Sequence, residues 1–70
     1  MRNGTKLKQL LEICDLSLRM EEGVIEIITI NKSSYQKRSK EGPTFSAVLD
    51  KAYRQMLKDA KADFHDVDHS

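Results

Sequence analysis

The sequence contains few of the residues on which small folds and catalytic sites often depend. Its 70 residues include one cysteine, one proline, three glycines and no tryptophan. A lone cysteine excludes an intramolecular disulfide and suits a reducing compartment, so we expect a cytoplasmic protein. The longest apolar stretch, residues 24–30, is interrupted by Glu26 and Thr29 and is too short to span a membrane. We therefore expect no membrane partner.

The charges of the chain nearly cancel. Twelve basic and eleven acidic residues leave a net charge of +1, which excludes a whole-molecule attraction to nucleic acid or to an anionic surface. The composition, 39% hydrophobic and 33% charged, is that of a globular chain rather than a disordered one. A chain of this length allows one domain with a small core and little room for a deep cleft.

The N-terminal segment has the period of a helix. Leu7, Leu10, Leu11 and Cys14 fall at positions i, i+3, i+4 and i+7, which is one helical face. The pattern predicts a short helix that ends at Cys14, with the hydroxyl of Thr5 as its N-terminal cap.

Two strand patterns follow this helix. Apolar and polar residues alternate over 16–20, which predicts a half-buried strand. Residues 24–30 are mostly β-branched and predict a second strand. Both of its faces are apolar, with Ile25 and Ile27 on one and Val24, Ile28 and Ile30 on the other. Two apolar faces indicate a central strand, or a strand whose second face meets another chain. Residues 21–23 predict a three-residue hairpin loop with a bulge.

The segment after the second strand is polar. Residues 31–34 predict a turn. Residues 35–40 form either a third strand or a loop, and their lysines would suit an edge strand, where positive charge deters unwanted strand pairing.

The C-terminal part of the chain carries the strongest helix signal. Gly42 and Pro43 break the chain, and Thr44 is expected to cap a helix over residues 45–61. Its apolar stripe contains Phe45, Val48, Leu49, Ala52 and Met56, with Tyr53, Leu57 and Ala60 at its margins. Residues 63–70 have no periodic pattern, so we expect a flexible acidic, histidine-containing tail outside a single domain of residues 1–62.

These elements together predict an α+β fold. A short N-terminal helix precedes a two- or three-stranded antiparallel sheet, and a longer C-terminal helix packs on that sheet.

The order of elements resembles that of the double-stranded-RNA-binding domain, which is also α-β-β-β-α and of similar length. The resemblance implies phosphate contacts by lysines at the start of the last helix. Residues 44–50 contain no lysine, however, and only residues 21–23 stand in place of that family's characteristic loop between its first two strands.

A second resemblance rests on residues 42–52, which open the C-terminal helix. They are similar to the corresponding part of small accessory proteins of phages and mobile elements, which often pair a short helix and a hairpin with a capped C-terminal helix. This resemblance implies a binding or inhibitory role and names no target.

No set of residues in the sequence predicts catalysis. Cys14 has no histidine on an ordered element to activate it, so a small buried apolar role is the simpler interpretation. His65 and His69 are four residues apart and could share a metal on a helix, but they fall in the predicted tail. Glu21 and Glu22 fall in a predicted turn, where no pocket surrounds them. We expect neither an enzyme nor a cofactor or metal site.

The leading hypothesis is a protein-interaction module. The sequence carries more apolar surface than one small core readily hides, and exposed apolar patches mark interfaces. Such a module would bind a protein partner or a second copy of itself, through the second face of strand 24–30 or by strand addition at an edge. The candidate interface residues are Val24, Ile28, Ile30, Tyr53 and Leu57. The alternative is that these residues belong to a wide internal core.

The second hypothesis is nucleic-acid binding through the basic stretch, residues 32–40. Positive side chains near an aromatic ring could contact phosphates and stack on a base. The candidate contacts are Lys32, Tyr35, Lys37, Arg38 and Lys40, with Lys51 and Arg54 from the last helix. The alternative is a solvated edge strand, and in an extended segment Lys37 and Arg38 would point to opposite faces.

Overall fold

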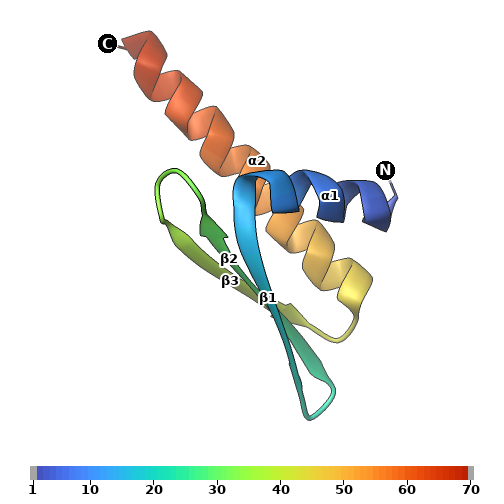
Figure 1. Cartoon of the computed structure of the whole chain (residues 1–70). Helices are drawn as coiled ribbons and strands as arrows, with labels where there is room; N and C mark the ends of the chain where they lie inside the picture. Colours follow the sequence, from blue (N-terminus) through green and yellow to red (C-terminus); the bar gives the residue numbers. More distant parts are fainter. Residues whose placement is uncertain (1, 70) are drawn as a thin grey trace.

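Both helices pack on one face of a three-stranded antiparallel sheet (Figure 1). The computed structural model describes the backbone of residues 2–69 and the side chains of residues 2–61. The elements are α1 (Asn3–Ile13), β1 (Cys14–Glu21), β2 (Val24–Asn31), β3 (Lys37–Gly42) and α2 (Phe45–His69). The strand order is β1-β2-β3, so β2 is the central strand. The predicted α+β fold is confirmed, and the sheet has three strands rather than two.

Helix α1 begins earlier than the sequence predicts. The carbonyl of Arg2 accepts hydrogen bonds from the backbone N–H groups of Thr5 and Lys6, at 3.1 Å each. Thr5 therefore lies inside the first turn, and the prediction that it caps the helix is wrong. At the other end, the N–H of Cys14 donates to the carbonyl of Leu10 while Cys14 itself is extended. The helix consequently passes into β1 without a loop.

Strands β1 and β2 form a hairpin with a tight turn. They pair over eight residues without interruption, from Cys14 opposite Asn31 to Glu21 opposite Val24. Glu22 and Gly23 form the turn, with φ angles of 51° and 77°. Two residues in the left-handed conformation give a turn whose twist matches that of the strands. Glycine adopts this conformation freely, and glutamate adopts it at some cost in energy. The predicted three-residue loop with a bulge is therefore wrong.

The turn between β2 and β3 is held by a side chain. The Oδ1 atom of Asn31 accepts hydrogen bonds from the N–H groups of Ser33 and Ser34, at 2.8 and 2.9 Å. Tyr35 follows with a φ angle of 61°, in the left-handed region. The third strand therefore exists, but it starts at Lys37 instead of residue 35 and ends at Gly42.

Helix α2 begins where the sequence predicts. The hydroxyl of Thr44 accepts a hydrogen bond from the N–H of Ala47 at 3.3 Å, which confirms the cap. The helix continues to His69, beyond the predicted end at residue 61, because no glycine or proline follows Pro43 to stop it. The predicted flexible tail falls on residues whose side chains lie outside the described part of the chain.

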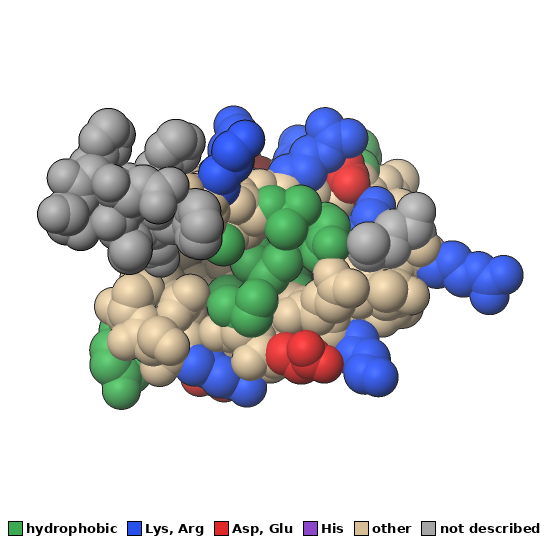
Figure 2. Space-filling model, turned by 90° about the horizontal axis from the view of Figure 1, so that it is seen from above, with side chains coloured by type: hydrophobic (Ala, Val, Ile, Leu, Met, Phe, Trp, Pro, Cys, Tyr) green, Lys and Arg blue, Asp and Glu red, His purple; other side chains and the backbone are tan. Residues whose placement is uncertain are grey.

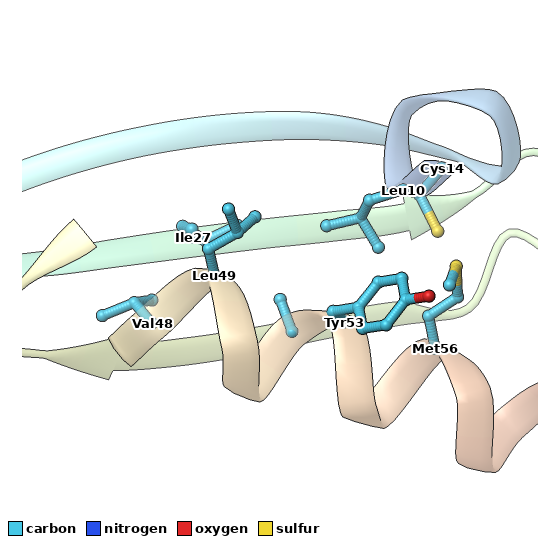
Figure 3. Packing of buried hydrophobic residues seen from close by; sticks show 8 residues of the cluster. Leu10, Cys14, Ile27, Val48, Leu49, Tyr53 and Met56 are labelled. Atoms are coloured by element: carbon cyan, nitrogen blue, oxygen red, sulfur yellow. The ribbon is translucent and has the colours of Figure 1, made fainter. Parts of the chain in front are cut away.

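The core lies between the sheet and the two helices (Figure 3). Alternate residues of β2 point into it, and Ile27 is completely buried. On α2, the buried residues recur every three or four positions, as an amphipathic helix requires. The buried hydrophobic cluster consists of Leu10, Cys14, Ile27, Val48, Leu49, Ala52, Tyr53 and Met56, with Leu7, Leu16, Ile25 and Phe45 packed against it.

Polar contacts join the two helices along their length. The ammonium group of Lys6 lies 2.9 Å from a carboxylate oxygen of Asp50. The hydroxyl of Tyr53 donates a hydrogen bond of 2.7 Å to the side chain of Gln9. A later residue of α1 contacts a later residue of α2, since Lys6 bonds to Asp50 and Gln9 to Tyr53, so the two helices run in the same direction. Over the residues that the structure describes, neither helix has the length and apolar character that a membrane crossing requires.

The contact between Lys6 and Asp50 predicts a dependence of stability on acid. The hydrogen bond from Lys6 lowers the pKa of the Asp50 carboxyl below its usual value, and the nearby Arg54 lowers it further. A carboxyl with a depressed pKa in the fold stabilises it above the unfolded pKa of about 4, and this contribution disappears as the pH falls through the folded pKa.

We therefore expect Asp50→Asn to lower the melting temperature slightly at pH 7 and to have a smaller effect at pH 2, because the contribution of the carboxylate declines as the pH falls. Thermal unfolding of both proteins at the two pH values measures the difference. An equal difference at both pH values would show that the charge of Asp50 is not the cause.

Candidate interaction surface

The end of β1 is an apolar surface that the helices leave bare. Register places Leu16, Leu18 and Met20 on the same face of the sheet as the buried Ile27. Helix α2 packs against β2 and β3, and α1 packs against α2 and β1, which it joins at Cys14. The far end of β1 therefore lacks a cover, and 57% of Leu18 and 75% of Met20 are exposed.

The outer edge of β1 also carries unpaired backbone groups. Within the described residues, β1 pairs with β2 on one side and with no strand on the other. The N–H of Lys32 donates to the carbonyl of Ile13 at 2.9 Å, so the backbone groups of Ile13 point toward β2. Because alternate residues of a strand direct their N–H and C=O groups to opposite sides, the odd-numbered residues of β1 also point theirs toward β2. Leu16, Leu18 and Met20 consequently direct theirs away from the sheet.

The face of the sheet opposite the helices is mixed in character. Val24 and Ile30 are 42% and 37% exposed on this face, and Ile28 is half-buried. Charged side chains of the same face surround them, because Asp15 and Lys37 stand beside Ile30 and Glu21 stands beside Val24. The prediction that the second strand has two apolar faces is confirmed, but on the second face Glu26 separates Val24 from Ile28 and Ile30.

A third apolar area lies on α1. Leu7 and Leu11 flank a shallow depression together with Gly4, Lys8, Glu12 and Lys32. Seen from the side of α1, hydrophobic side chains occupy the centre of the molecule and basic side chains stand around them (Figure 2). Leu11 is 44% exposed there. Leu11 thus adds a smaller apolar area on α1, bordered by the charged residues Lys8, Glu12 and Lys32.

Two residues of the predicted protein interface have different environments in the fold. Tyr53 is only 8% exposed and belongs to the core, because α1 packs beside α2 and covers it. Its assignment to an exposed interface is therefore corrected. Leu57 is 48% exposed on α2, as the prediction requires.

The basic stretch does not form one surface. Lys37 lies on the outer face of the sheet, opposite Ile30, whereas Arg38 and Lys40 lie on the helix-covered face, opposite Thr29 and Ile27. This confirms that adjacent basic residues point to opposite sides.

Several basic side chains are already engaged within the fold. Arg38 makes two hydrogen bonds of 3.0 and 3.2 Å to the carboxylate of Asp59. The ammonium groups of Lys32 and Lys51 donate to the backbone carbonyls of Leu11 and Glu41, and Arg54 pairs with Asp50 at 2.9 Å. Tyr35 differs from these residues, since 78% of it is exposed.

Cys14 lines a depression that also contains the Arg38–Asp59 pair. Only 6% of Cys14 is exposed, and burial raises the pKa of its thiol, as do the charges of Asp59 and Asp15. A raised pKa disfavours the thiolate, which is the reactive form. The prediction that Cys14 is a small buried residue is confirmed.

Among the described residues no group of three or more potential metal ligands occurs, and His65 and His69 lie outside the described side chains.

Sequence reasoning missed the exposure of Leu18 and Met20. Their alternation with polar residues correctly indicated a strand with one apolar face. A comparison of the length of the first helix with that of β1 could have revealed this surface, because a short helix that runs directly into β1 cannot also cover the far end of that strand.

Comparisons with protein-family models, curated proteins and solved structures find no match to this chain.

Proposed function

We propose that this domain is a non-enzymatic, cytoplasmic interaction module that works by binding protein and associates with itself. The observation that supports it is the apolar surface of the β1–β2 hairpin that no helix covers, above all Leu18 and Met20. Side chains of this size on an unpaired edge strand are unusual on a small monomer and are typical of a contact surface.

The environment of Cys14 supports the non-enzymatic part of the proposal. A catalytic thiol needs access to substrate and a lowered pKa, whereas this thiol is buried and its pKa is raised. Arg38 and Asp59 near it neutralise each other across a two-bond ion pair that joins β3 to α2. The polar groups of this region therefore stabilise the packing of the helix on the sheet.

Self-association is tested by replacing one exposed leucine at a time. We expect the mass found by light scattering to rise with concentration over about 10–500 μM, the range of weak to moderate homodimers. Leu18→Lys should reduce this association at least about tenfold, because it places a charge in an apolar contact. Leu57→Lys is the comparison that separates the two exposed areas, since Leu57 is similarly exposed but lies on α2, and a loss in this variant instead would place the contact on α2. A constant monomer mass over the whole range would refute self-association.

Nucleic-acid binding is the second candidate function, and the exposed Tyr35 in the turn between Lys32 and Lys37 favours it. Fluorescence anisotropy of labelled duplex and single-stranded DNA and RNA, at low and moderate salt, tests it on the same samples. Binding that weakens steeply with salt and is lost on substitution of Tyr35 by alanine would place this function first. Absence of binding would leave the basic residues of β3 as protection for the edge of the sheet.

A further inference from the structure

We propose that the domain forms a homodimer in which β1 pairs antiparallel with β1 of a second copy, in a register centred on Ser17. The two three-stranded sheets then become one sheet of six strands. This inference rests on the proposed self-association and specifies which surface carries it and in which geometry. It follows from the chemistry of the two edges, from the direction of the backbone groups and from the positions of the charges.

The two edges of the sheet differ in how well they resist pairing. Three of the six residues of β3 are Lys37, Arg38 and Lys40, and like charges would face one another in a pair of such strands. Strand β1 has no proline and no bulge, and every residue of its helix-covered face is apolar. The β1 edge is therefore the one that a second strand can join.

The backbone limits the registers that two β1 strands can adopt. Leu16, Leu18 and Met20 direct their N–H and C=O groups away from the sheet, as the hydrogen bond of Lys32 to Ile13 shows. Antiparallel strands exchange hydrogen bonds only where both residues of a pair direct these groups toward each other. Even-numbered residues must therefore face even-numbered residues. This condition also keeps the apolar faces of both copies on the same side of the joint sheet.

Charge selects one register from those that remain. With Ser17 at the centre, Asp15 faces the partner's Arg19, and the symmetry repeats this pair of opposite charges. A register centred on Leu18 would place Asp15 opposite the partner's Glu21. A register centred on Arg19 would place the Arg19 side chains of the two copies opposite each other. Both alternatives join like charges, which is unfavourable directly across strands. Centres at Leu16 or Met20 shorten the overlap.

Both charged residues are available for this contact. Arg19 is 65% exposed at its side chain, and its distances to Glu21 and Glu26 within the chain are long, 3.7 and 4.0 Å. Asp15 is exposed and makes no ion pair or side-chain hydrogen bond to any other residue whose side chain is described. The guanidinium group can therefore turn to the partner's Asp15 without breaking a close contact.

The same register covers the apolar residues that the monomer exposes. Leu16 faces the partner's Leu18, so four leucines meet across the dyad on the helix-covered face. Met20, the most exposed of the core-facing residues, lies opposite the partner's Cys14, where α1 of the partner joins its strand. Leu11, which is 44% exposed, lies in the last turn of α1 just before this end of the strand. Charge, hydrogen bonding and burial thus agree on one arrangement.

The register is tested with two variants that complement each other. Asp15→Arg places Arg opposite Arg in a homodimer, and Arg19→Asp places Asp opposite Asp, so each variant alone should dimerise about tenfold or more weakly than the wild type. In an equimolar mixture, the register centred on Ser17 brings two pairs of opposite charges together. We therefore expect sedimentation velocity to show a one-to-one dimer in the mixture, with a dissociation constant close to that of the wild type, and mainly monomer for each variant alone. Far-UV circular dichroism checks that both variants are folded.

A cross-link gives a second measurement that does not depend on charge. In a Cys14→Ala background, Ser17→Cys places two thiols opposite each other in a pair that lacks hydrogen bonds, where the Cα atoms lie about 4.5 Å apart and a disulfide can form. Arg19→Cys in the same background is the control, because that residue faces the partner's Asp15. We expect oxidation to cross-link the first variant and not the second.

The outcomes separate this register from the function on which it rests. A wild-type dimer whose variants neither lose association nor restore it on mixing, and whose Ser17→Cys form does not cross-link, would overturn the β1 register and leave self-association intact. A wild-type chain that stays monomeric up to about 500 μM would overturn both, since even a weak homodimer is populated at that concentration.

Discussion

Replacing Leu49 by alanine should remove most of the stability of this domain. Leu49 is completely buried between α2 and the sheet, and its truncation leaves a cavity in a small core, which contains eight buried hydrophobic residues among the described side chains. Such substitutions cost about 2–5 kcal/mol. A domain of this size has roughly 3–5 kcal/mol of net stability, so a large fraction of the variant should be unfolded in buffer at 25 °C.

The measurement is urea unfolding of the wild type and the variant, followed by circular dichroism at one low protein concentration, so that association contributes equally little to both. Leu57→Ala is the control, because it removes the same atoms from the same helix at a position that is 48% exposed. We expect that control to change the free energy of unfolding by no more than about 0.5 kcal/mol. Similar losses in both variants would mean that α2 does not present Leu49 to the core.

The second large effect concerns the reactivity of Cys14. Alkylation with iodoacetamide at pH 7.5 should be at least about a hundredfold slower in the native protein than in concentrated urea, because reaction requires the thiol to leave the core and to lose its proton. The burial of Cys14 and the raised pKa of its thiol are the two causes. Native and unfolded rates of similar size, measured by mass spectrometry, would contradict the position of Cys14 in the structure.

The same thiol predicts a loss of stability in alkali. A group whose pKa is higher in the fold than in the unfolded chain stabilises the fold fully below the unfolded pKa, and its contribution declines as the pH rises above that value, about 8.5 for cysteine. Wild-type stability should therefore fall between about pH 8.5 and 10 relative to that of Cys14→Ala. The variant shares every other titrating group, so a constant difference between the two proteins across this range would exclude the thiol as the cause.

The elements of the fold were predictable where local chemistry decides them. The alternation of Ile25 and Ile27 with Val24 and Ile28 gave β2 and both of its faces, and the hydroxyl of Thr44 gave the start of α2. Turn details were less accessible, because Glu22 occupies a left-handed conformation that its residue type disfavours. The tight pairing of Glu21 with Val24 imposes that conformation, and pairing is a property of both strands together.

The candidate surface was only partly predictable, because exposure depends on where the helices lie on the sheet. Tyr53 was expected at the margin of the core stripe, yet α1 packs beside α2 and encloses it. Leu18 and Met20 show the opposite error, since their period marks them as core residues and no helix reaches them. Neither outcome is contained in the local pattern, because both depend on contacts between residues far apart in the sequence.

The bonds between α1 and α2 have a consequence for the order in which the molecule can fold during its synthesis. Asn3, Lys6 and Gln9 bond to residues that follow them by 43 or 44 positions. When the first helix leaves the ribosome, the segment that will bind it has not yet emerged, because it lies 43 or 44 residues later in the chain. A helix of eleven residues is unstable alone, and the hairpin that follows has an apolar face without a cover. We therefore expect the nascent chain to remain unfolded until α2 emerges, and α2 then to complete the packing of α1 and of the sheet in one cooperative step.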